Sequence, residues 1–376
     1  MRWTRKLLFL GIIWSVALAM LLGATEIALR LTADDWSPAV RMNIIRNRTY
    51  AFDVSSLYDT PHPIVRYSRN QWGLRDDCAN PAEIDILTIG GSTTDQRFIP
   101  FASTWQKVME DDLSRSAGKH VCVSNAGVDG HSTYGHLRAF KRWLPLIPGL
   151  KPRIILFYIG INDADFTFAG PNGFDDDDSS GPRLWLKELE ITQFWFWASD
   201  VIGSIAQVET GKLGHHRQHF VPEDYVFDTM TPGTVAQART GAERFRQRLR
   251  KLIAESRHYG ADILCVTQPH RRVKVKNGKP FGIRNAMGGP GPLRYNGLDY
   301  DYSIRQLNAV MREECGEGGL IDLYHQQFTD GQFYDFSHTN PQGSRMIGHI
   351  LADRVGKSAM MADLAGTSVS AGPTPR

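Results

Sequence analysis

The sequence predicts an α/β fold, a three-layer α/β/α sandwich around a central parallel sheet of about five strands, preceded by one N-terminal transmembrane helix. Three observations support this prediction. Apolar runs rich in β-branched residues alternate with stretches of helical periodicity, which is typical of a parallel sheet covered on both faces. Turn or polar residues follow these runs, and a long uncharged apolar run lies near the N-terminus.

The composition bounds the class of protein. The chain has 376 residues, of which 42% are hydrophobic, so it is long enough to bury a sizeable core. Its formal net charge is only +3 at pH 7, and the sequence has no basic-aromatic motif of a known nucleic-acid module. Nucleic acid is therefore not an expected partner.

The apolar run at residues 7–23 is the first element. It carries no charge, follows Arg2, Arg5 and Lys6, and precedes Glu26. About 17 residues is the short end of what crosses a bilayer, and an Ala-Leu-Ala sequence lies inside the run instead of after it, where a cleavage site belongs. We therefore expect an uncleaved, single-pass signal anchor. A cleaved signal peptide and a buried soluble helix are the alternatives.

The charges around this run predict its topology. Because three cations precede it and an acidic residue follows, the N-terminus should be cytoplasmic, and the chain from about residue 30 onward should be periplasmic or extracellular. We divide the chain into an anchor at 1–30, a linker and N-terminal extension at 31–80, one main domain at 81–358 and a flexible tail at 359–376.

Five runs are expected to form the central sheet. Strands are predicted at residues 84–89, 120–124, 154–159 and 263–267, with a weaker one at 320–323. Helices are predicted at residues 103–116, 135–144, 235–258 and 341–355. Insertions at about 165–235 and 270–300 interrupt this alternation. Both follow predicted strand ends, where ligands bind in open parallel sheets, so they are candidate walls of a cleft.

Two segments of these insertions carry unusual composition. Phe-Trp-Phe-Trp at 194–197 is expected to pack between the insertion and the main domain; lining a cleft or touching the bilayer are the alternatives. The stretch at 270–279 carries five Lys and Arg residues, which would attract an anionic substrate or form a solvated turn.

The four cysteines show no metal-binding spacing. Cys78, Cys122, Cys265 and Cys315 include neither a C-x-x-C pair nor a Cys/His pattern, so no zinc site is expected. We expect Cys122 and Cys265 to be small buried hydrophobic residues of two strands. A bond between Cys78 and Cys315 is left open, because an oxidising compartment permits disulfides without requiring them.

Four short blocks contain residues that suggest chemistry. They read GGST at 90–93, NAGVDG at 125–130, GIND at 160–163 and DFSH at 335–338. The first three follow predicted strands directly, and the carboxyl ends of parallel strands lie at one edge of a sheet. We therefore expect these three blocks to converge, with the fourth just before the last helix.

The first and fourth blocks hold the residue types of a nucleophilic site. A serine becomes a strong nucleophile when a base takes its proton, and a histidine base works best when a carboxylate fixes its tautomer. Ser92 lies in the first block, and Asp335 and His338 are three residues apart in the fourth. The second and third blocks offer glycine N–H groups and an Asn amide, which can stabilise negative charge on a carbonyl oxygen.

In this order the four blocks resemble those of the SGNH, or GDSL-like, hydrolase family. The chain resembles a membrane-anchored member of that family. The resemblance covers about residues 84–355 and implies a flavodoxin-like fold and a serine hydrolase that needs no metal and no organic cofactor. The residues carried over are Ser92, Asp335 and His338 as the catalytic triad and Ser92, Gly130 and Asn162 as the oxyanion hole.

The resemblance departs from the family at one position. The usual G-D-S is G-G-S here, with Gly91 in a place that is not one of the catalytic groups. Gly127 is the less favoured oxyanion glycine, because the family's residue ends an N-x-x-x-x-G pattern that here ends at Gly130. The segment NQWGLRDD at 70–77 also resembles membrane-anchored members, and we expect Arg75 in it to be a structural anchor.

Other histidines compete with His338 for the role of base. His215, His216 and His219 lie in the first insertion without nearby Cys or acidic ligands, and we expect solvated loop side chains, with weak metal binding as the alternative. His270 lies at a strand end and could reach the cleft, but no carboxylate stands beside it in the sequence.

Together these features predict an extracytoplasmic serine esterase. Because the resembled family acts largely on O-acyl groups, the expected substrate is an O-acyl ester, above all an O-acetyl ester, on envelope or extracellular carbohydrate. An O-acetyltransferase of an exopolysaccharide or cell-wall glycan, as in the SGNH-like alginate acetylation proteins, is one alternative. A non-catalytic glycan-binding protein that retains the fold is the other. The expected partners are the ester substrate and the membrane, and the oligomeric state is not predicted.

Overall fold

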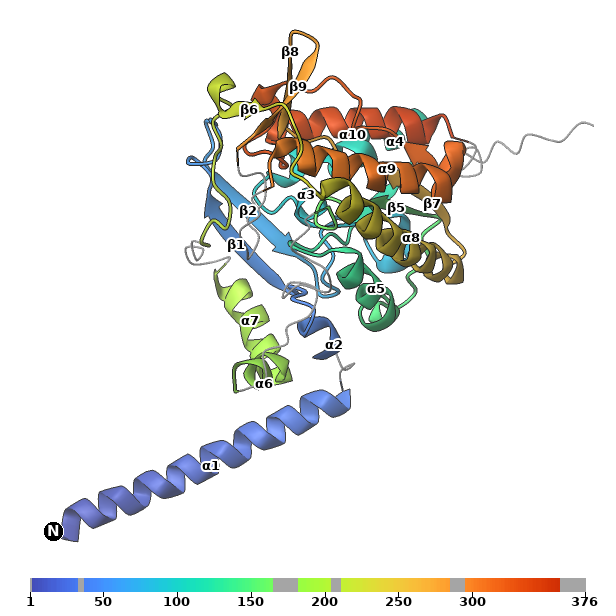
Figure 1. Ribbon diagram of the computed structural model, residues 1–376. Helices are drawn as coiled ribbons and strands as arrows, with labels where there is room; N and C mark the ends of the chain where they lie inside the picture. Colours follow the sequence, from blue (N-terminus) through green and yellow to red (C-terminus); the bar gives the residue numbers. More distant parts are fainter. Residues whose placement is uncertain (1, 33–36, 165–181, 204–210, 285–294, 359–376) are drawn as a thin grey trace, which may run out of the picture.

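A five-stranded parallel sheet forms the centre of the protein in the computed structural model (Figure 1). The structure describes residues 2–32, 37–164, 182–203, 211–284 and 295–358; the predicted tail and parts of both insertions lie outside them. The strands, in spatial order, are β10 (Leu320–Ile321), β7 (Asp262–Val266), β5 (Ile154–Tyr158), β3 (Ile84–Gly90) and β4 (Cys122–Asn125). All neighbouring pairs are parallel, which confirms the predicted fold class.

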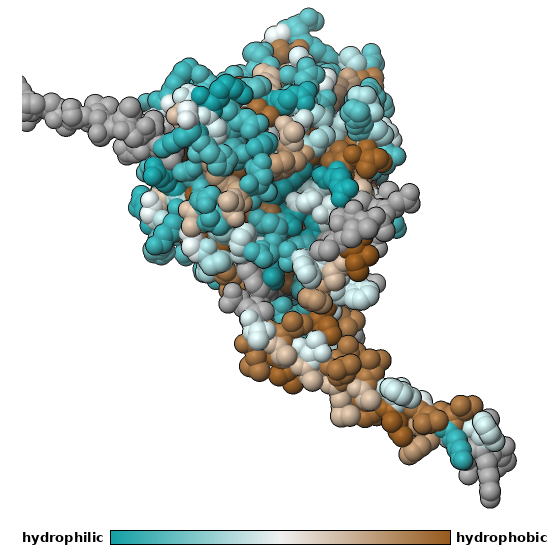
Figure 2. Space-filling model, turned by 180° about the vertical axis from the view of Figure 1, so that it is seen from behind, coloured by the Kyte–Doolittle hydropathy of each residue, from teal (hydrophilic) through white to brown (hydrophobic). Residues whose placement is uncertain are grey.

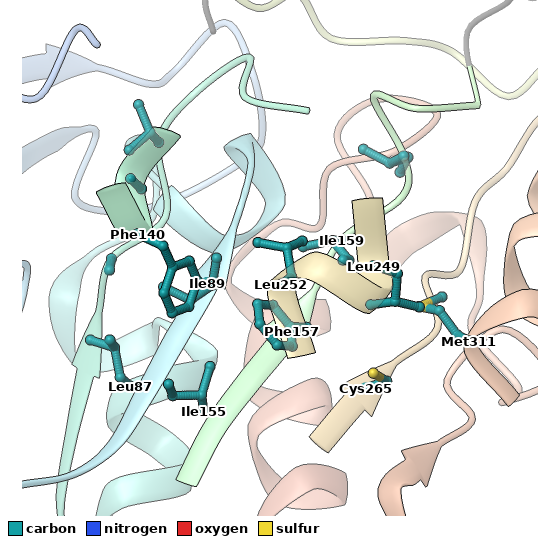
Figure 3. Close-up of a cluster of buried hydrophobic side chains, with 14 of the residues drawn as sticks. Leu87, Ile89, Phe140, Ile155, Phe157, Ile159, Leu249, Leu252, Cys265 and Met311 are labelled. Atoms are coloured by element: carbon teal, nitrogen blue, oxygen red, sulfur yellow. The ribbon is translucent and has the colours of Figure 1, made fainter. Parts of the chain in front are cut away.

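Helices cover both faces of the sheet. One face carries α5 (Thr133–Arg142), α8 (Thr234–His258) and α9 (Gly297–Gly319), and the other carries α4 (Trp105–Ala117) and α10 (Pro341–Gly356). The side chains of β3 alternate between them, since Leu87 and Ile89 belong to the first core and Ile86 to the second. Figure 3 shows the first core, where Phe140 and Leu252 lie over the sheet residues. Two layers of buried hydrophobic residues thus hold the sheet rigid beneath the candidate site.

The chain reverses its direction of sheet growth at β3. From β3 it passes to β4 on one side and then to β5 on the other, so the carboxyl ends of these strands are neighbours. The register pairs Thr88 with Asn125 and Gly90 with Tyr158. Such a switch point is where open α/β sheets bind ligands, and the first three sequence blocks follow directly from these strand ends.

Several elements were not predicted from the sequence. The N-terminal extension forms an antiparallel hairpin, and a second small sheet contains β6, β9 and β8 in that order. The bounds are β1 (Arg48–Asp53), β2 (Ile64–Arg69), β6 (Tyr225–Phe227), β8 (Val273–Lys276) and β9 (Lys279–Ile283). Helix α9 was also missed, because its pattern begins beside an insertion and Gly316 interrupts it at a φ of 71°.

The N-terminal hairpin packs onto the main domain through its own hydrophobic cluster. Phe52 of β1 contacts Phe98, which follows the first sequence block, and Tyr58, between the two strands, contacts Tyr334, which precedes the fourth. Tyr67 of β2 belongs to the same cluster. The extension therefore packs against segments that flank the first and fourth blocks.

The apolar N-terminal run forms the long helix α1 (Arg2–Thr32). Residues 6–32 are long and apolar enough to cross a membrane, and none of this segment's most apolar window is buried in the protein. After the short α2 (Ser37–Val40), the first insertion contributes α6 (Pro182–Glu188) and α7 (Glu190–Gly203). The Glu26 carboxylate of α1 accepts the N–H groups of Glu190 and Ile191, so the end of α1 meets the start of α7.

All four cysteines form disulfides, in a pairing that the sequence did not predict. Cys78 bonds to Cys122, and Cys265 bonds to Cys315. The expectation that Cys122 and Cys265 are unbonded hydrophobic residues was wrong, and so was the possible Cys78–Cys315 pair. The reason is topological: Cys78 lies just before β3 and Cys122 opens the adjacent β4, while Cys315 lies on α9, which packs against β7 and Cys265.

Each disulfide should add to stability by restricting the unfolded chain. The bonds close loops with sequence separations of 44 and 50. We expect Cys265→Ala/Cys315→Ala to lower the free energy of unfolding by about 4 kcal/mol. Chemical denaturation of the full chain in detergent micelles measures this loss, and a reductant should destabilise the wild type more than the double variant. Free thiols in the unreduced, denatured protein would contradict the pairing.

Candidate active site

The first block forms a tight turn between a strand and a helix. β3 ends at Gly90, and α3 (Ser92–Asp95) begins two residues later. A Cβ atom on Gly90 would lie 2.4 Å from the Tyr158 carbonyl oxygen, and one on Gly91 would lie 2.7 Å from Asn162 Nδ2. Glycine is required at Gly90 because a side chain would collide with the backbone of β5. At Gly91 the nearest atom belongs to the end of the Asn162 side chain, so the first block lies directly beside the third.

The structure brings Ser92, His338 and Asp335 together. The Ser92 Oγ lies 2.6 Å from His338 Nε2, and His338 Nδ1 lies 2.7 Å from an Asp335 carboxylate oxygen. The other Asp335 oxygen accepts the backbone N–H groups of Ser337 and His338, at 2.8 and 2.7 Å. The DFSH loop thus holds its own carboxylate in place, and the three side chains form one continuous hydrogen-bonded line.

Electrostatics favour an ionised Asp335 beside a basic His338. Burial raises the pKa of the Asp335 carboxyl, but the His338 ring and the N–H donors outweigh it and lower the pKa to about 2. Burial lowers the pKa of His338, while the Asp335 carboxylate more than compensates and raises it above its usual 6.5. The ring is consequently a stronger proton acceptor than a free imidazole.

His215 packs directly against His338. The ring centroids are 4.2 Å apart, and His215 Nδ1 lies 2.8 Å from the Tyr334 hydroxyl. Its Nε2 lies 4.0 Å from an Asp129 carboxylate oxygen. Burial and then the neighbouring His338 lower the pKa of His215 to about 4, so this ring is neutral at pH 7. It covers one side of His338 without adding a positive charge.

The expectation of a fully solvated histidine cluster was therefore wrong for His215, whereas His216 and His219 are exposed. No sequence signal marked His215, because its hydrogen-bond partner Tyr334 is 119 residues away in the chain. His270 has no carboxylate beside it in the sequence, but in the fold Asp301 of α9 lies 3.2 Å from its Nε2. Its Nδ1 accepts the Arg272 N–H, so both ring nitrogens face protein groups.

The second and third blocks lie beside the serine. Gly130 has a φ of 79°, in the region that favours glycine. Asn162 Nδ2 donates one hydrogen bond to the His131 carbonyl oxygen at 2.9 Å, and an amide nitrogen carries a second hydrogen. The Gly127 N–H donates to Asn125 Oδ1 at 2.8 Å.

A buried arginine, which the sequence did not single out, joins the first two blocks. Arg69 of β2 forms an ion pair with Asp95 at the end of α3. The same guanidinium donates to the carbonyl oxygens of Asn125 and Gly127 in the second block and of Gly73 in the N-terminal extension. Arg69 lies just before the NQWGLRDD segment. It is a buried residue of β2, a strand that was not predicted from the sequence.

Arg75 lies next to this pair and behaves as the expected structural anchor. It is buried and donates to the carbonyl oxygens of Asp95, Gln96 and Ile99, at 2.7 to 3.0 Å. These bonds satisfy the carbonyl groups at and after the end of α3, which have no partners within the helix.

Two groups of described side chains are close enough to share a metal ion. One consists of His215, Asp335 and His338; the other contains Glu110 and the two cysteines of a disulfide. A metal in the first group would compete for the His338 nitrogens that contact Asp335 and Ser92. The arrangement of these three residues therefore suits acid–base chemistry better than metal binding.

Comparison with known proteins gives a family match. The model of the GDSL-like lipase/acylhydrolase family matches residues 88–346 of this chain. Among curated proteins no match is found.

Three solved structures resemble the fold. They are an acetylxylan esterase from Geobacillus stearothermophilus, a lipase/acylhydrolase from Enterococcus faecalis and an esterase from Pseudoalteromonas sp.. The identities are 13%, 14% and 11%, and the TM-scores are 0.39, 0.39 and 0.35. Each comparison covers 72% of this chain, and 93%, 95% and 96% of the respective structures.

The Asp335–His338 contact predicts a pH dependence. If neutral His338 is the base, activity should rise with pH through a midpoint above 6.5, because the carboxylate raises the pKa of the ring. In Asp335→Asn the largest influence that raises the pKa of His338 is lost while burial still lowers it, so the midpoint should move to lower pH. The rate should also fall, by as much as roughly 10⁴-fold, the magnitude of the matching change in a well-studied serine protease.

The measurement is the pH profile of kcat/KM for a chromogenic acetyl ester with the wild type and Asp335→Asn. Asp330→Asn changes a nearby carboxylate that pairs with Arg271 and Lys274 instead, and serves as the control. An unchanged midpoint in Asp335→Asn would show that this carboxylate does not set the pKa of the base.

Proposed function

Because this chain belongs to the GDSL-like lipase/acylhydrolase family, we propose that it is a serine esterase in which Ser92 is the nucleophile. His338 is the general base, and Asp335 orients it. The 2.6 Å contact between Ser92 Oγ and His338 Nε2, continued to Asp335, is the observation that supports this proposal.

The reaction proceeds through an acyl-enzyme. His338 takes the Ser92 proton as Oγ attacks the ester carbonyl, and the carbonyl oxygen becomes an oxyanion. The N–H groups of Ser92 and Gly130 and the second amide hydrogen of Asn162 stabilise it. The protonated His338 then gives its proton to the leaving alcohol. A water molecule, deprotonated by His338, attacks the acyl-enzyme and releases the acid.

Asn162 is well placed for this role because it is already oriented. Its hydrogen bond to the His131 carbonyl oxygen holds the amide in one orientation. A preorganised donor contributes more to the transition state than one that must first be ordered.

The proposed substrate is an O-acetyl ester on envelope or extracellular carbohydrate. The family match and the proposed location outside the cytoplasm support this substrate.

Two observations support the proposed location. Two disulfides among the described cysteines favour an oxidising compartment. The apolar run at residues 7–23, within α1, follows three cations, which favours a cytoplasmic N-terminus. Protease added to intact spheroplasts should digest the chain beyond residue 32, and protection of the whole chain would contradict this topology.

The apolar surface of α1 supports an anchor and continues onto the domain. Figure 2 shows hydrophobic residues along the helix as far as the base of the folded part. On α6 and α7, which meet the end of α1, the exposed large side chains include Trp185, Phe194 and Trp195, the last with 70% of its surface exposed. Aromatic side chains of this kind favour the membrane interface, so the α6–α7 pair would rest on the bilayer.

The function is tested by hydrolysis of a chromogenic acetyl ester by the full chain in detergent micelles. Ser92→Ala should lower kcat by roughly 10³- to 10⁶-fold while leaving thermal unfolding unchanged, because a triad member is lost but no packing is. Ser56→Ala, an exposed serine, is the matched control. Equal activity in Ser92→Ala and the wild type would exclude the proposed nucleophile.

The membrane contact is tested by photo-crosslinking in lipid nanodiscs. Benzoylphenylalanine is placed at Trp195 or at Val275, whose exposed surfaces are nearly equal at 70% and 71%. Lipid adducts should form at position 195 and not at position 275, on the β8–β9 hairpin. Equal adduct yields at the two positions would show that α7 does not face the bilayer.

A further inference from the structure

A cavity of about 320 Å³ lies between three parts of the chain. The N-terminal extension contributes Arg46, Arg48 and Tyr50, and the α6–α7 insertion contributes Lys187 and Phe196. Val128 and Asp129 of the second sequence block form the third wall. A single sugar unit fits such a volume.

The cavity lies close to the proposed catalytic site. Asp129, in its wall, directly precedes the oxyanion residue Gly130. An Asp129 carboxylate oxygen lies 4.0 Å from His215 Nε2, and the His215 ring is 4.2 Å from the His338 ring, measured between centroids. A ligand in the cavity would therefore lie only a few side chains from the reacting ester.

The lining carries a clear excess of positive charge. Among the described lining residues, four cations, Arg46, Arg48, Arg97 and Lys187, accompany one carboxylate, Asp129. Arg97 contacts that carboxylate at 3.7 Å and Asp95 at 3.2 Å.

Arg48, one arginine of this lining, is held between two aromatic rings. The Arg48 guanidinium carbon lies 4.6 Å from the centroid of the Tyr50 ring and 4.2 Å from that of Phe196. Contact with two rings orders the planar fork, which suits a carboxylate or a phosphate. The amide side chains of Asn43 and Gln193 also line the cavity and can bond sugar hydroxyl groups.

The basic stretch at 270–279 is a weaker candidate for the same recognition. Lys274 contacts Asp330 at 2.7 Å and the Phe220 carbonyl at 3.0 Å. Lys276 donates to the carbonyl oxygens of Pro222 and Tyr225. These cations hold the β8–β9 hairpin in place, so the sequence motif that first suggested an anionic substrate has a structural use.

We propose that the cavity is a subsite for a sugar unit bearing a carboxylate or a phosphate, next to the unit that carries the acyl ester. This inference rests on the proposed function and names its substrate class, an O-acylated anionic glycan. The subsite places the acylated unit over Ser92 by binding its charged neighbour, and takes no part in the chemical step.

The experiment compares kcat/KM for three substrates with the full chain in detergent micelles. O-acetylated tetragalacturonate provides carboxylates, an O-acetylated glucoside 6-phosphate provides a phosphate, and O-acetylated xylotetraose is neutral. At low salt we expect at least one anionic substrate to exceed the neutral one by about tenfold, and the ratio to fall as salt screens the charges. The better anionic substrate identifies the charged group.

Variants of the cavity lining test which residues cause the preference for an anionic substrate. Arg48→Gln and Lys187→Gln should each reduce the ratio of anionic to neutral kcat/KM by about tenfold, and Arg48→Lys should restore part of it. Lys279→Gln, an exposed cation of the β8–β9 hairpin, should leave the ratio unchanged. A poorly folded variant loses activity on both substrates, so the ratio separates misfolding from a lost subsite.

Two outcomes would overturn the proposed subsite. One is equal kcat/KM for all three substrates in the wild type, and the other is an anionic preference that Arg48→Gln and Lys187→Gln both retain. If the protein hydrolyses none of the three and no chromogenic ester, the proposed function itself fails. The two failures are therefore distinguishable in the same set of assays.

Discussion

The buried ion pair between Arg69 and Asp95 is the constraint on which the rest of the site depends. Asp95 ends the short helix that begins at Ser92, and Arg69 also holds two carbonyl groups of the loop that leads to Gly130. One guanidinium thus links the helix that begins at Ser92, the proposed nucleophile, to the loop that leads to Gly130, the proposed oxyanion glycine. Removing one partner of such a pair lowers stability by about 3–5 kcal/mol because the other charge stays buried. The ion pair therefore holds this part of the site in place.

This constraint connects the N-terminal extension to the candidate site. Arg69 comes from β2, and the same hairpin packs Phe52 and Tyr58 against residues that flank the first and fourth blocks. The chain therefore builds the site from both sides: the central sheet supplies Ser92 and Asn162, and the extension fixes them from outside. The extension also forms one wall of the basic cavity, so the proposed subsite and the proposed catalytic residues share one scaffold.

Much of the fold could be predicted from the sequence, because buried parallel strands are short apolar runs. Each of the five predicted strands overlaps an observed strand. The four blocks were informative for a similar reason, since residues after parallel strands must meet at one sheet edge. The disulfide pairs, Arg69 and His215 could not be predicted. Their partners are remote in the chain, and no local pattern specifies which remote side chains meet. Helix α9 was not predicted because Gly316 and the neighbouring insertion interrupt its helical periodicity.

The central claim is that Ser92 carries the acyl group, and covalent trapping tests it most directly. The full chain is incubated with a chromogenic alkyl phosphonate, and the modified peptide is identified by mass spectrometry. We expect one phosphonate per chain, attached to Ser92, with loss of esterase activity in proportion to labelling. An enzyme that hydrolyses esters but is labelled at another residue, or loses no activity when Ser92 is labelled, would contradict the account.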